Sequence, residues 1–231
     1  MKIYHYETIP STNAEAKKMI LNGEREGVFL AKRQTAGRGR LGRSFFSENG
    51  IFMSLIIAPE KILFDPSFLT SAVAAATCRA ITEKGFCVGI KWVNDLLLDG
   101  KKICGILTEA VSLGSQPLAY VVGIGVNVGG NEFPEDIREI ADTLPLNEHE
   151  KNDLFFHILD HIESVLSEEK TSILTYLKEK SVVLGKPIRF YGAKEGKGVA
   201  IDLDENGGLI VETDEKQKIV LTGGEISVRT K

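Results

Sequence analysis

Apolar residues recur along the chain with two different spacings, which predict a mixture of helices and strands. The helical spacing covers residues 12–22, 65–84, 152–169 and 171–183. Alternating or continuous apolar runs bounded by turn residues predict strands at 28–31, 51–57, 87–92, 96–98, 103–111 and 120–128. Hairpins with helices bunched before and after them favour an α+β fold over a doubly wound sheet.

Helix caps and turn residues support several of these boundaries. Thr12 and Glu15 are spaced as a capping box, and Gly23 is a natural stop for the helix at 12–22. Asp99-Gly100 is a strong tight-turn signal, so we expect 96–98 and 103–111 to pair as a β-hairpin. These elements therefore predict one large domain that extends to residue 183.

The character of the pattern changes after residue 183. From Lys186 onward the chain predicts short strands: Val199, Ile201 and Leu203 alternate with polar residues, and an Asn-Gly-Gly turn follows at 206–208. We expect a small β-barrel there, and hence two domains, 1–183 and 184–231. A core of that size is marginal alone, so the small domain is expected to pack on the large one.

Composition narrows the class of protein. The 231 residues carry a formal net charge of −4, which argues against bulk, non-specific binding of nucleic acid. Cys78, Cys87 and Cys104 form no C-x-x-C pair, which indicates reduced thiols and a cytoplasmic location. The sequence starts without a signal-peptide pattern and holds no apolar run long enough to span a bilayer, so we expect no membrane association.

The segment from Gln34 to Arg43 is the richest in candidate chemistry, with three glycines and three arginines. Glycine lets a ligand approach the backbone, and arginine offers a permanent charge and a planar fork of donors that suits phosphate and carboxylate. Residues 37–42 match G-x-G-x-x-G, but a second strand follows where a dinucleotide site needs a helix, which excludes that site. The sequence also has no G-K-[ST] phosphate loop.

Five short motifs follow one another in a fixed order along the chain. They are Ser11-Thr12-Asn13, Gly37 to Arg43, Lys91 to Asp95, Lys102 to Leu107 and Gly123 to Asn127. Together and in this order they resemble the biotin–protein ligase family, also called biotin–[carboxylase] ligases. Gly223 to Ser227 is similar to the C-terminal domain of that family. The resemblance covers nearly the whole chain.

The resemblance implies a fold and an activity. The fold would be a mixed sheet akin to class II aminoacyl-tRNA synthetase cores, plus an SH3-like C-terminal barrel. The activity would use ATP and Mg²⁺ to convert biotin to biotinyl-5'-AMP, and would then transfer biotin to a lysine of a biotin carboxyl carrier domain. Because the motifs begin at Ser11, we expect a short form without a DNA-binding domain. A homodimer is expected by analogy.

The resemblance also implies which residues form the site. The catalytic positive charges would come from Arg38, Arg40 and Lys102. Biotin would be bound by Ser11, Thr12, Asn13, Gln34, Gly37, Arg38, Arg40, Lys102, Gly105 and Gly123. ATP and the adenylate would be bound by Arg40, Arg43, Phe45, Lys91, Trp92, Asn94, Asp95, Lys102 and Asn127. Mg²⁺ would be held mainly through phosphate oxygens, and the residues able to orient it or the nucleotide are Asn94, Asp95 and Asn127.

Two residues depart from the family pattern, and other interpretations stay open. Val93 replaces the usual Pro, and Phe45 replaces an aromatic residue, often Trp, over the adenine; Phe can stack but has no indole N–H. Ser11 and Thr12 could cap a helix, and Trp92 could be a core residue. One rival function is a lipoate or octanoate ligase or transferase of the same fold. The other is a non-catalytic phosphate- or RNA-binding module.

Overall fold

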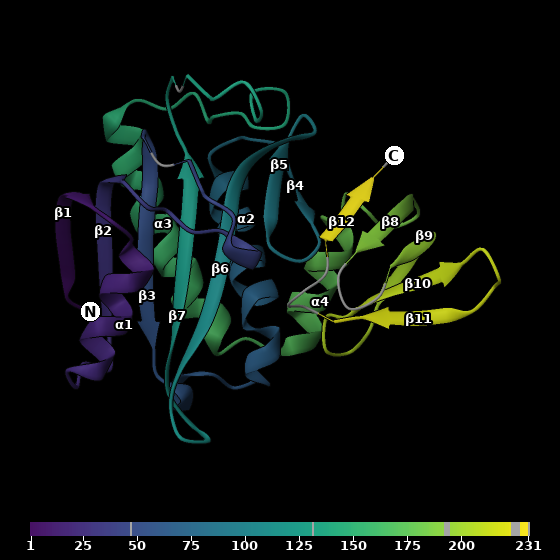
Figure 1. Cartoon of the computed structure of the whole chain (residues 1–231), viewed down its shortest axis with the longest axis horizontal. Coiled ribbons are helices and arrows are strands. Elements are labelled where there is room, and N and C mark those ends of the chain that lie inside the picture. Colours follow the sequence, from purple (N-terminus) through teal and green to yellow (C-terminus); the bar gives the residue numbers. More distant parts are fainter. Residues whose placement is uncertain (47, 131, 192–194, 223–226, 231) are drawn as a thin grey trace.

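Seven strands from distant parts of the chain form one mixed sheet (Figure 1). They belong to a computed structural model that describes residues 1–46, 48–130, 132–191, 195–222 and 227–230. Across the sheet the order is β1-β2-β3-β7-β6-β5-β4; β1 and β2 are parallel, and all other neighbours are antiparallel. The strands are β1 (Ile3–Ile9), β2 (Gly27–Gln34), β3 (Gly50–Ile57), β4 (Val88–Lys91), β5 (Asp95–Leu98), β6 (Lys101–Leu113) and β7 (Gln116–Asn127).

Helices cover both faces of this sheet. α1 (Thr12–Leu21) packs on one face against β2, β3 and β7, while α2 (Leu69–Glu83) and α3 (Glu148–Leu166) cover the other (Figure 1). Ala72, Ala76 and Ala80 are fully buried, and such short side chains let α2 lie close to the sheet and to α3. Within the described ranges we find no helix with both the length and the apolar character of a membrane span.

The predicted hairpin is present, and one strand is added to the predicted set. Asp99 and Gly100 join β5 to β6 with φ values of 50° and 82°, the positive values that a tight two-residue turn requires. β1 was not predicted because polar residues such as His5 and Glu7 interrupt its apolar pattern. β1 lies at the edge of the sheet beside β2, so much of this strand faces solvent.

Three helices differ from their predicted bounds for local reasons. α3 spans Glu148–Leu166 where 152–169 was predicted, because Asn147 caps its first turn. α2 starts at Leu69 because Asp65 caps a separate 3-10 helix, η3 (Pro66–Phe68), by accepting from the Ser67 amide at 2.8 Å. α4 (Lys170–Glu179) ends before residue 183 because the chain then runs beside β4, where Val182 N–H donates to the Ile90 carbonyl at 3.0 Å. Two further 3-10 helices are η1 (Arg40–Gly42) and η2 (Pro59–Lys61).

A second sheet, of five strands, forms the C-terminal part of the molecule (Figure 1). Its order is β11-β10-β9-β8-β12. The strands are β8 (Pro187–Tyr191), β9 (Gly196–Leu203), β10 (Leu209–Thr213), β11 (Lys218–Leu221) and β12 (Ser227–Thr230). The predicted α+β class, with a mixed sheet, flanking helices and a small C-terminal β domain, is confirmed. Most of the motif predicted at 223–227 lies outside the described residues.

The first turn of α3 yields a stability prediction. Asn147 Oδ1 accepts from the Glu150 amide at 3.1 Å, and the Glu150 carboxylate accepts from the Asn147 amide at 2.9 Å. Because this capping box satisfies donors at the helix start, we expect Asn147→Ala to lower the free energy of unfolding by about 1 kcal/mol in urea titrations. Glu163→Ala, at an exposed position of the same helix, is the matched control. Equal stability of the two variants would contradict the role of the cap.

Candidate functional site

Three glycines leave part of the main sheet without side chains, and we call them the glycine floor. Gly105 of β6 lies directly opposite Gly125 of β7, and Gly123 shares the face of Gly125 because residues two apart in a strand point the same way. An added Cβ would lie 2.5 Å from the Phe45 ring at Gly125, and 2.1 Å from Asn13 Oδ1 at Gly123. Only glycine fits, because these side chains approach the backbone itself.

A set of hydrogen-bonded side chains borders the glycine floor, and we call it the polar network. The Thr12 amide and hydroxyl donate to Gln34 Oε1 at 2.8 and 3.1 Å. The Ser54 hydroxyl lies 2.7 Å from Thr12 Oγ1 and 2.6 Å from Asn13 Oδ1, and Asn13 Nδ2 donates to Glu109 Oε2 at 2.8 Å. Since Thr12, Asn13 and Ser54 are buried, donors and acceptors are fixed in an otherwise apolar surrounding.

The start of α1 explains how this network is placed. Ser11 is the N-cap and accepts from the Ala14 amide at 3.4 Å, so the cap lies one residue before the predicted position at Thr12. Thr12 can then direct its side chain toward β2 and β3. Sequence reasoning missed Ser54 and Glu109. Ser54 could have been found as the polar residue inside the otherwise apolar strand β3.

Glu109 gives the polar network a pH dependence. Burial raises the pKa of its carboxyl, but hydrogen bonds from Asn13 and Lys17 and the charges of Lys17 and Arg38 outweigh burial, so the pKa lies below its ordinary value of 4.5. The lowered pKa means that the carboxylate stabilises the fold above pH 4.5 and that this contribution disappears as the pH falls through the lowered pKa.

We therefore expect Glu109→Gln to flatten the acid side of the stability profile. Thermal unfolding recorded between about pH 3 and 6 should show a smaller loss of Tm on acidification than the wild-type protein shows. Glu205→Gln, at an exposed turn position, is the control. A Glu109→Gln profile parallel to the wild-type profile would contradict the assignment.

The arginine-rich segment folds back on itself above the sheet. The Gly39 N–H donates to the Arg43 carbonyl at 2.7 Å, and residues 38 and 44 form a β-bridge. The 3-10 helix η1 lies between them, and in Figure 1 this segment crosses in front of β7 and β6. Arg40 is partly buried by this arrangement, while Arg38 and Arg43 remain exposed.

Arg40 is joined to the motif at 91–95, and Lys102 meets the same motif. Arg40 Nη1 donates to Asn94 Oδ1 at 2.9 Å, and Asn94 Nδ2 donates to the Ile106 carbonyl at 3.0 Å. Lys102 Nζ lies 2.7 Å from Asp95 Oδ1. Three predicted motifs therefore meet at one place: the β5–β6 hairpin brings 91–95 and 102–107 together, and 37–43 comes from a distant part of the chain.

The electrostatics of this place favour an anion. Burial lowers the pKa of the Arg40 guanidinium; the charge of Asp95 opposes this shift and that of Arg43 adds to it. Arginine nevertheless stays charged at neutral pH. Lys102 Nζ also lies 5.7 Å from the centre of the Phe45 ring. Since two partly buried cations, Arg40 and Lys102, face one carboxylate, a bound anion would neutralise the remaining positive charge.

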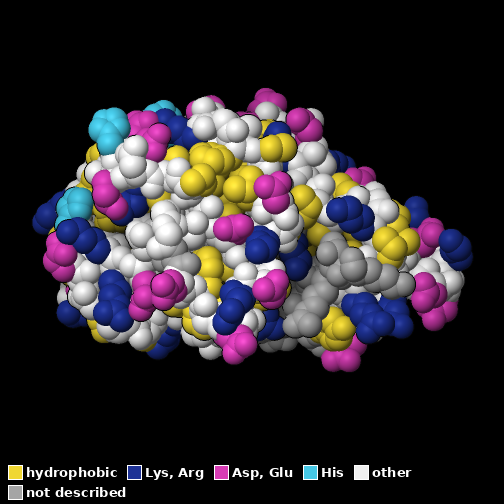
Figure 2. Space-filling view, turned by 90° about the horizontal axis from the view of Figure 1, so that it is seen from above, with side chains coloured by type: hydrophobic (Ala, Val, Ile, Leu, Met, Phe, Trp, Pro, Cys, Tyr) yellow, Lys and Arg dark blue, Asp and Glu magenta, His cyan; other side chains and the backbone are white. Residues whose placement is uncertain are grey.

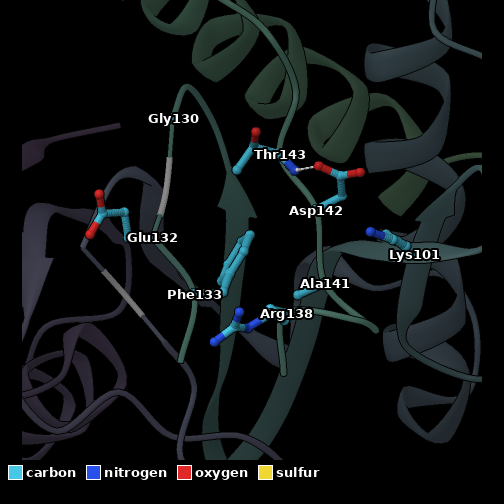
Figure 3. A pocket seen from close by; sticks show the side chains of 8 residues that line it. All are labelled: Lys101, Gly130, Glu132, Phe133, Arg138, Ala141, Asp142 and Thr143. Carbon is cyan, nitrogen blue, oxygen red and sulfur yellow. Dashed lines mark hydrogen bonds between the residues drawn. The ribbon is translucent and has the colours of Figure 1, made fainter. Parts of the chain in front are cut away.

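An open pocket of about 530 Å³ lies between the start of β6 and the segment that follows β7. Its wall is attached to the motifs: the Lys102 amide donates to the Ile140 carbonyl at 2.8 Å, and Asn127 Nδ2 donates to the Asp142 carbonyl at 3.1 Å. Figure 3 shows Phe133 in the middle of the lining, between Glu132 on one side and Asp142 on the other. The lining residues are Lys101, Gly130, Glu132, Phe133, Arg138, Ala141, Asp142 and Thr143.

Sequence reasoning missed these pocket residues. Apart from Lys101, which begins β6, they lie in a segment without helical or strand periodicity, between the end of β7 and the start of α3. The signal that could have found it is its length, because a long irregular stretch directly after a ligand motif is usually functional.

The structure gathers most of the predicted site residues and sets others apart. Those bordering the glycine floor, or part of it, are Ser11, Thr12, Asn13, Gln34, Phe45, Gly105 and Gly123. Those around the cation cluster are Arg40, Asn94, Asp95 and Lys102, with Asn127 at the pocket wall. Trp92 points away, since its indole N–H donates to the Gly207 carbonyl of the C-terminal sheet at 2.8 Å. Lys91 ends β4, and Gly37 is buried at the base of the arginine segment.

Comparison with known proteins agrees with this geometry. The chain matches the Biotin/lipoate A/B protein ligase family over residues 6–127 and the Biotin protein ligase C terminal domain over residues 183–229. It is 35% identical to the bifunctional ligase/repressor BirA of Bacillus subtilis (strain 168), over 92% of this chain and 70% of that protein. It is 29% identical to the biotin–[acetyl-CoA-carboxylase] ligase of Paracoccus denitrificans, over 91% of this chain and 94% of that protein.

A solved structure shares the whole fold. The biotin protein ligase from Aquifex aeolicus in complex with biotin and ATP superimposes with a TM-score of 0.85 at 25% identity, over 100% of this chain and 99% of that one. The first family match alone spans more than half of the 231 residues. This chain therefore belongs to the Biotin/lipoate A/B protein ligase family.

Proposed function

We propose that this protein is an ATP-dependent biotin–protein ligase that forms biotinyl-5'-AMP and transfers biotin to a lysine of a biotin carboxyl carrier domain. One observation carries the choice of biotin: the buried polar network stands directly beside the glycine floor. Biotin has a ureido group that needs paired donors and acceptors, attached to a compact apolar ring system. A side-chain-free strip of sheet suits the ring system, and Thr12, Gln34 and Asn13 suit the ureido group.

The positive groups would serve the first reaction step. A carboxylate oxygen of biotin attacks the α-phosphorus of ATP, a P–O bond to pyrophosphate breaks, and the biotinyl adenylate results. Both reactants are anionic, so Arg40 and Lys102 would neutralise the carboxylate and phosphates and stabilise charge that develops at phosphorus. Arg38 and Arg43 are exposed on the same segment and can approach the phosphates when it closes over the ligands.

The 530 Å³ pocket is the place we assign to the nucleotide. It adjoins Lys102 and Asn127, and its volume lies in the range of small-molecule sites. Mg²⁺ commonly binds through one or two carboxylates together with substrate phosphates, and its chemistry here would be to neutralise those phosphates. The described residues bring together no cluster of three or more His, Cys, Asp or Glu side chains. Suitable oxygens are those of Asn127, whose side-chain amide donates to the pocket wall, and of Asp95, which pairs with Lys102.

In the second step the neutral amine of an acceptor lysine attacks the adenylate carbonyl. An amide bond forms, the C–O bond to AMP breaks, AMP leaves with the bridging oxygen, and the proton lost by the amine passes to solvent. The chain contributes mainly position and electrostatics, because the adenylate is already reactive. The name of the Paracoccus denitrificans relative supports an acetyl-CoA carboxylase as the source of the carrier domain. A cytoplasmic location and a homodimer remain part of this proposal.

Two alternatives are weaker for specific reasons. A lipoate or octanoate site would not need the polar network, since those acids have no ureido group. An RNA-binding module would present a continuous basic surface. On the face shown in Figure 2, acidic and basic side chains are interspersed instead.

The proposal is tested by ATP–pyrophosphate exchange. Radiolabelled pyrophosphate should enter ATP when biotin is present, and should not when lipoate or octanoate replaces biotin at the same concentration. Exchange with lipoate or octanoate alone would assign the protein to the other branch of the family. A lack of exchange with all three acids would remove the ligase assignment.

A further inference from the structure

The turn between β9 and β10 of the C-terminal sheet touches the motif at 91–95 of the main sheet. Trp92 Nε1 donates to the Gly207 carbonyl at 2.8 Å, and Trp92 is only 8% exposed. The two residues lie in turns of different sheets, between β4 and β5 and between β9 and β10, and are far apart in sequence. Trp92 is also the sole tryptophan of the chain.

The turn is built rigidly for this contact. Asp204 Oδ1 accepts from the Asn206 amide at 2.8 Å and from the Gly208 amide at 2.7 Å. Gly207 has φ of 78°, which favours glycine, and a Cβ there would lie 2.8 Å from the Phe68 ring. The turn therefore fits closely against the start of α2 and aims one carbonyl at the indole.

The contact continues into the reactive part of the site. Trp92 lies two residues before Asn94, which accepts from Arg40 at 2.9 Å, and three before Asp95, which pairs with Lys102 at 2.7 Å. The Asn94 carbonyl also accepts from the Ile106 amide at 2.9 Å. A shift of Trp92 would thus be passed to both cations through a short length of backbone.

We infer that Trp92 is a positioning residue through which the turn at 204–208 holds Asn94 and Asp95 in register with Arg40 and Lys102. The inference rests on the proposed function. It states that the C-terminal sheet, through Trp92, affects the rate of adenylate formation. The effect falls mainly on adenylate formation, because the polar network that would recognise the ureido group is carried by α1, β2, β3 and β6, and Arg40 and Lys102 would meet biotin only at its carboxylate.

The test separates rate from affinity. Trp92→Phe keeps an apolar ring and removes the N–H; we expect kcat of biotin-dependent exchange to fall roughly 10-fold, since small misplacements of reacting groups are costly. The Kd of biotin, measured by calorimetry without ATP, should change less than about 2-fold. Asp204→Ala, which loosens the turn, should give the same split. Asp214→Ala, in the exposed β10–β11 turn, is the matched control and should behave as wild type.

Two readouts do not depend on activity. In Asp204→Ala the Trp92 emission should shift to longer wavelength, and in Trp92→Phe hydrogen exchange at the Ile106 amide should accelerate. Unchanged kcat with unchanged Ile106 protection would overturn the inference, and so would a parallel loss of kcat and biotin affinity. If the wild-type protein shows no biotin-dependent exchange, the proposed function fails, and the protection of Ile106 alone then decides whether the two sheets are coupled.

Discussion

Replacing Arg40 by Ala is expected to lower kcat of biotin-dependent ATP–pyrophosphate exchange by about 100- to 1,000-fold, the loss typical of removing one well-placed donor from a charged transition state. Arg40 is the arginine of its segment that is turned inward, where it is fixed by Asn94 and lies near the Lys102–Asp95 pair. Its charge is partly shielded from water, so each contact it makes to a phosphate is stronger than an exposed arginine would make.

Two further variants sharpen this expectation. Arg40→Lys keeps the charge but loses the planar fork, so its activity should fall between those of the wild-type protein and Arg40→Ala. Arg33→Ala is the control, because Arg33 precedes the same segment and makes an exposed ion pair with Glu48 at 3.3 Å. Comparable losses in Arg33→Ala and Arg40→Ala would show that general charge, and not the position of Arg40, matters.

Gly123→Val is expected to weaken biotin binding by about 100-fold. A side chain at this position would occupy the place of Asn13 Oδ1, 2.1 Å from the new Cβ, and would displace Asn13 from Ser54. Each hydrogen-bonding position lost from the polar network weakens binding by ~1.4 kcal/mol, which is about tenfold. The loss of two such positions therefore gives the expected weakening of about 100-fold. Overpacking should also lower the free energy of unfolding by ~1–3 kcal/mol.

Affinity and stability must therefore be measured together for this variant. Calorimetric titration gives the Kd of biotin, and circular dichroism shows whether the variant is folded at the titration temperature. Ala110→Val adds the same kind of side chain at an exposed position of the neighbouring strand and should leave the Kd unchanged. Wild-type affinity in a folded Gly123→Val protein would show that biotin does not depend on the polar network.

Much of the fold followed from local signals, and the missed parts share a physical reason. The hairpin at Asp99-Gly100 and the helix that stops before Gly23 depend on residues close together in sequence, and both are present. β1 and the end of α4 depend on pairing with distant strands, β2 and β4, which periodicity within one segment does not encode. Tertiary contacts override local preference at such places.

The candidate site residues also divide into those that local sequence motifs indicated and those that depend on distant parts of the chain. The motifs revealed Arg40, Lys102, Asn94 and the glycines, because each residue type there is tied to a chemical role. Glu109 acts through partners on other elements and leaves no pattern in its own neighbourhood. Ser54 and the irregular segment that supplies most of the pocket lining leave only weak signals, a single polar residue in an apolar strand and the length of the segment. Trp92 belongs to a motif, yet its contact with Gly207 became evident only when both sheets were in place.

Following the carboxylate oxygen of biotin tests most directly whether biotin is activated as an acyl adenylate. The protein is incubated with ATP, a biotin carboxyl carrier domain and biotin labelled with ¹⁸O in its carboxylate, and the released AMP is analysed by mass spectrometry. We expect one ¹⁸O atom in each AMP, because the bridging oxygen comes from biotin and leaves with the nucleotide. Unlabelled AMP, or ¹⁸O recovered in inorganic phosphate together with ADP, would contradict adenylate formation.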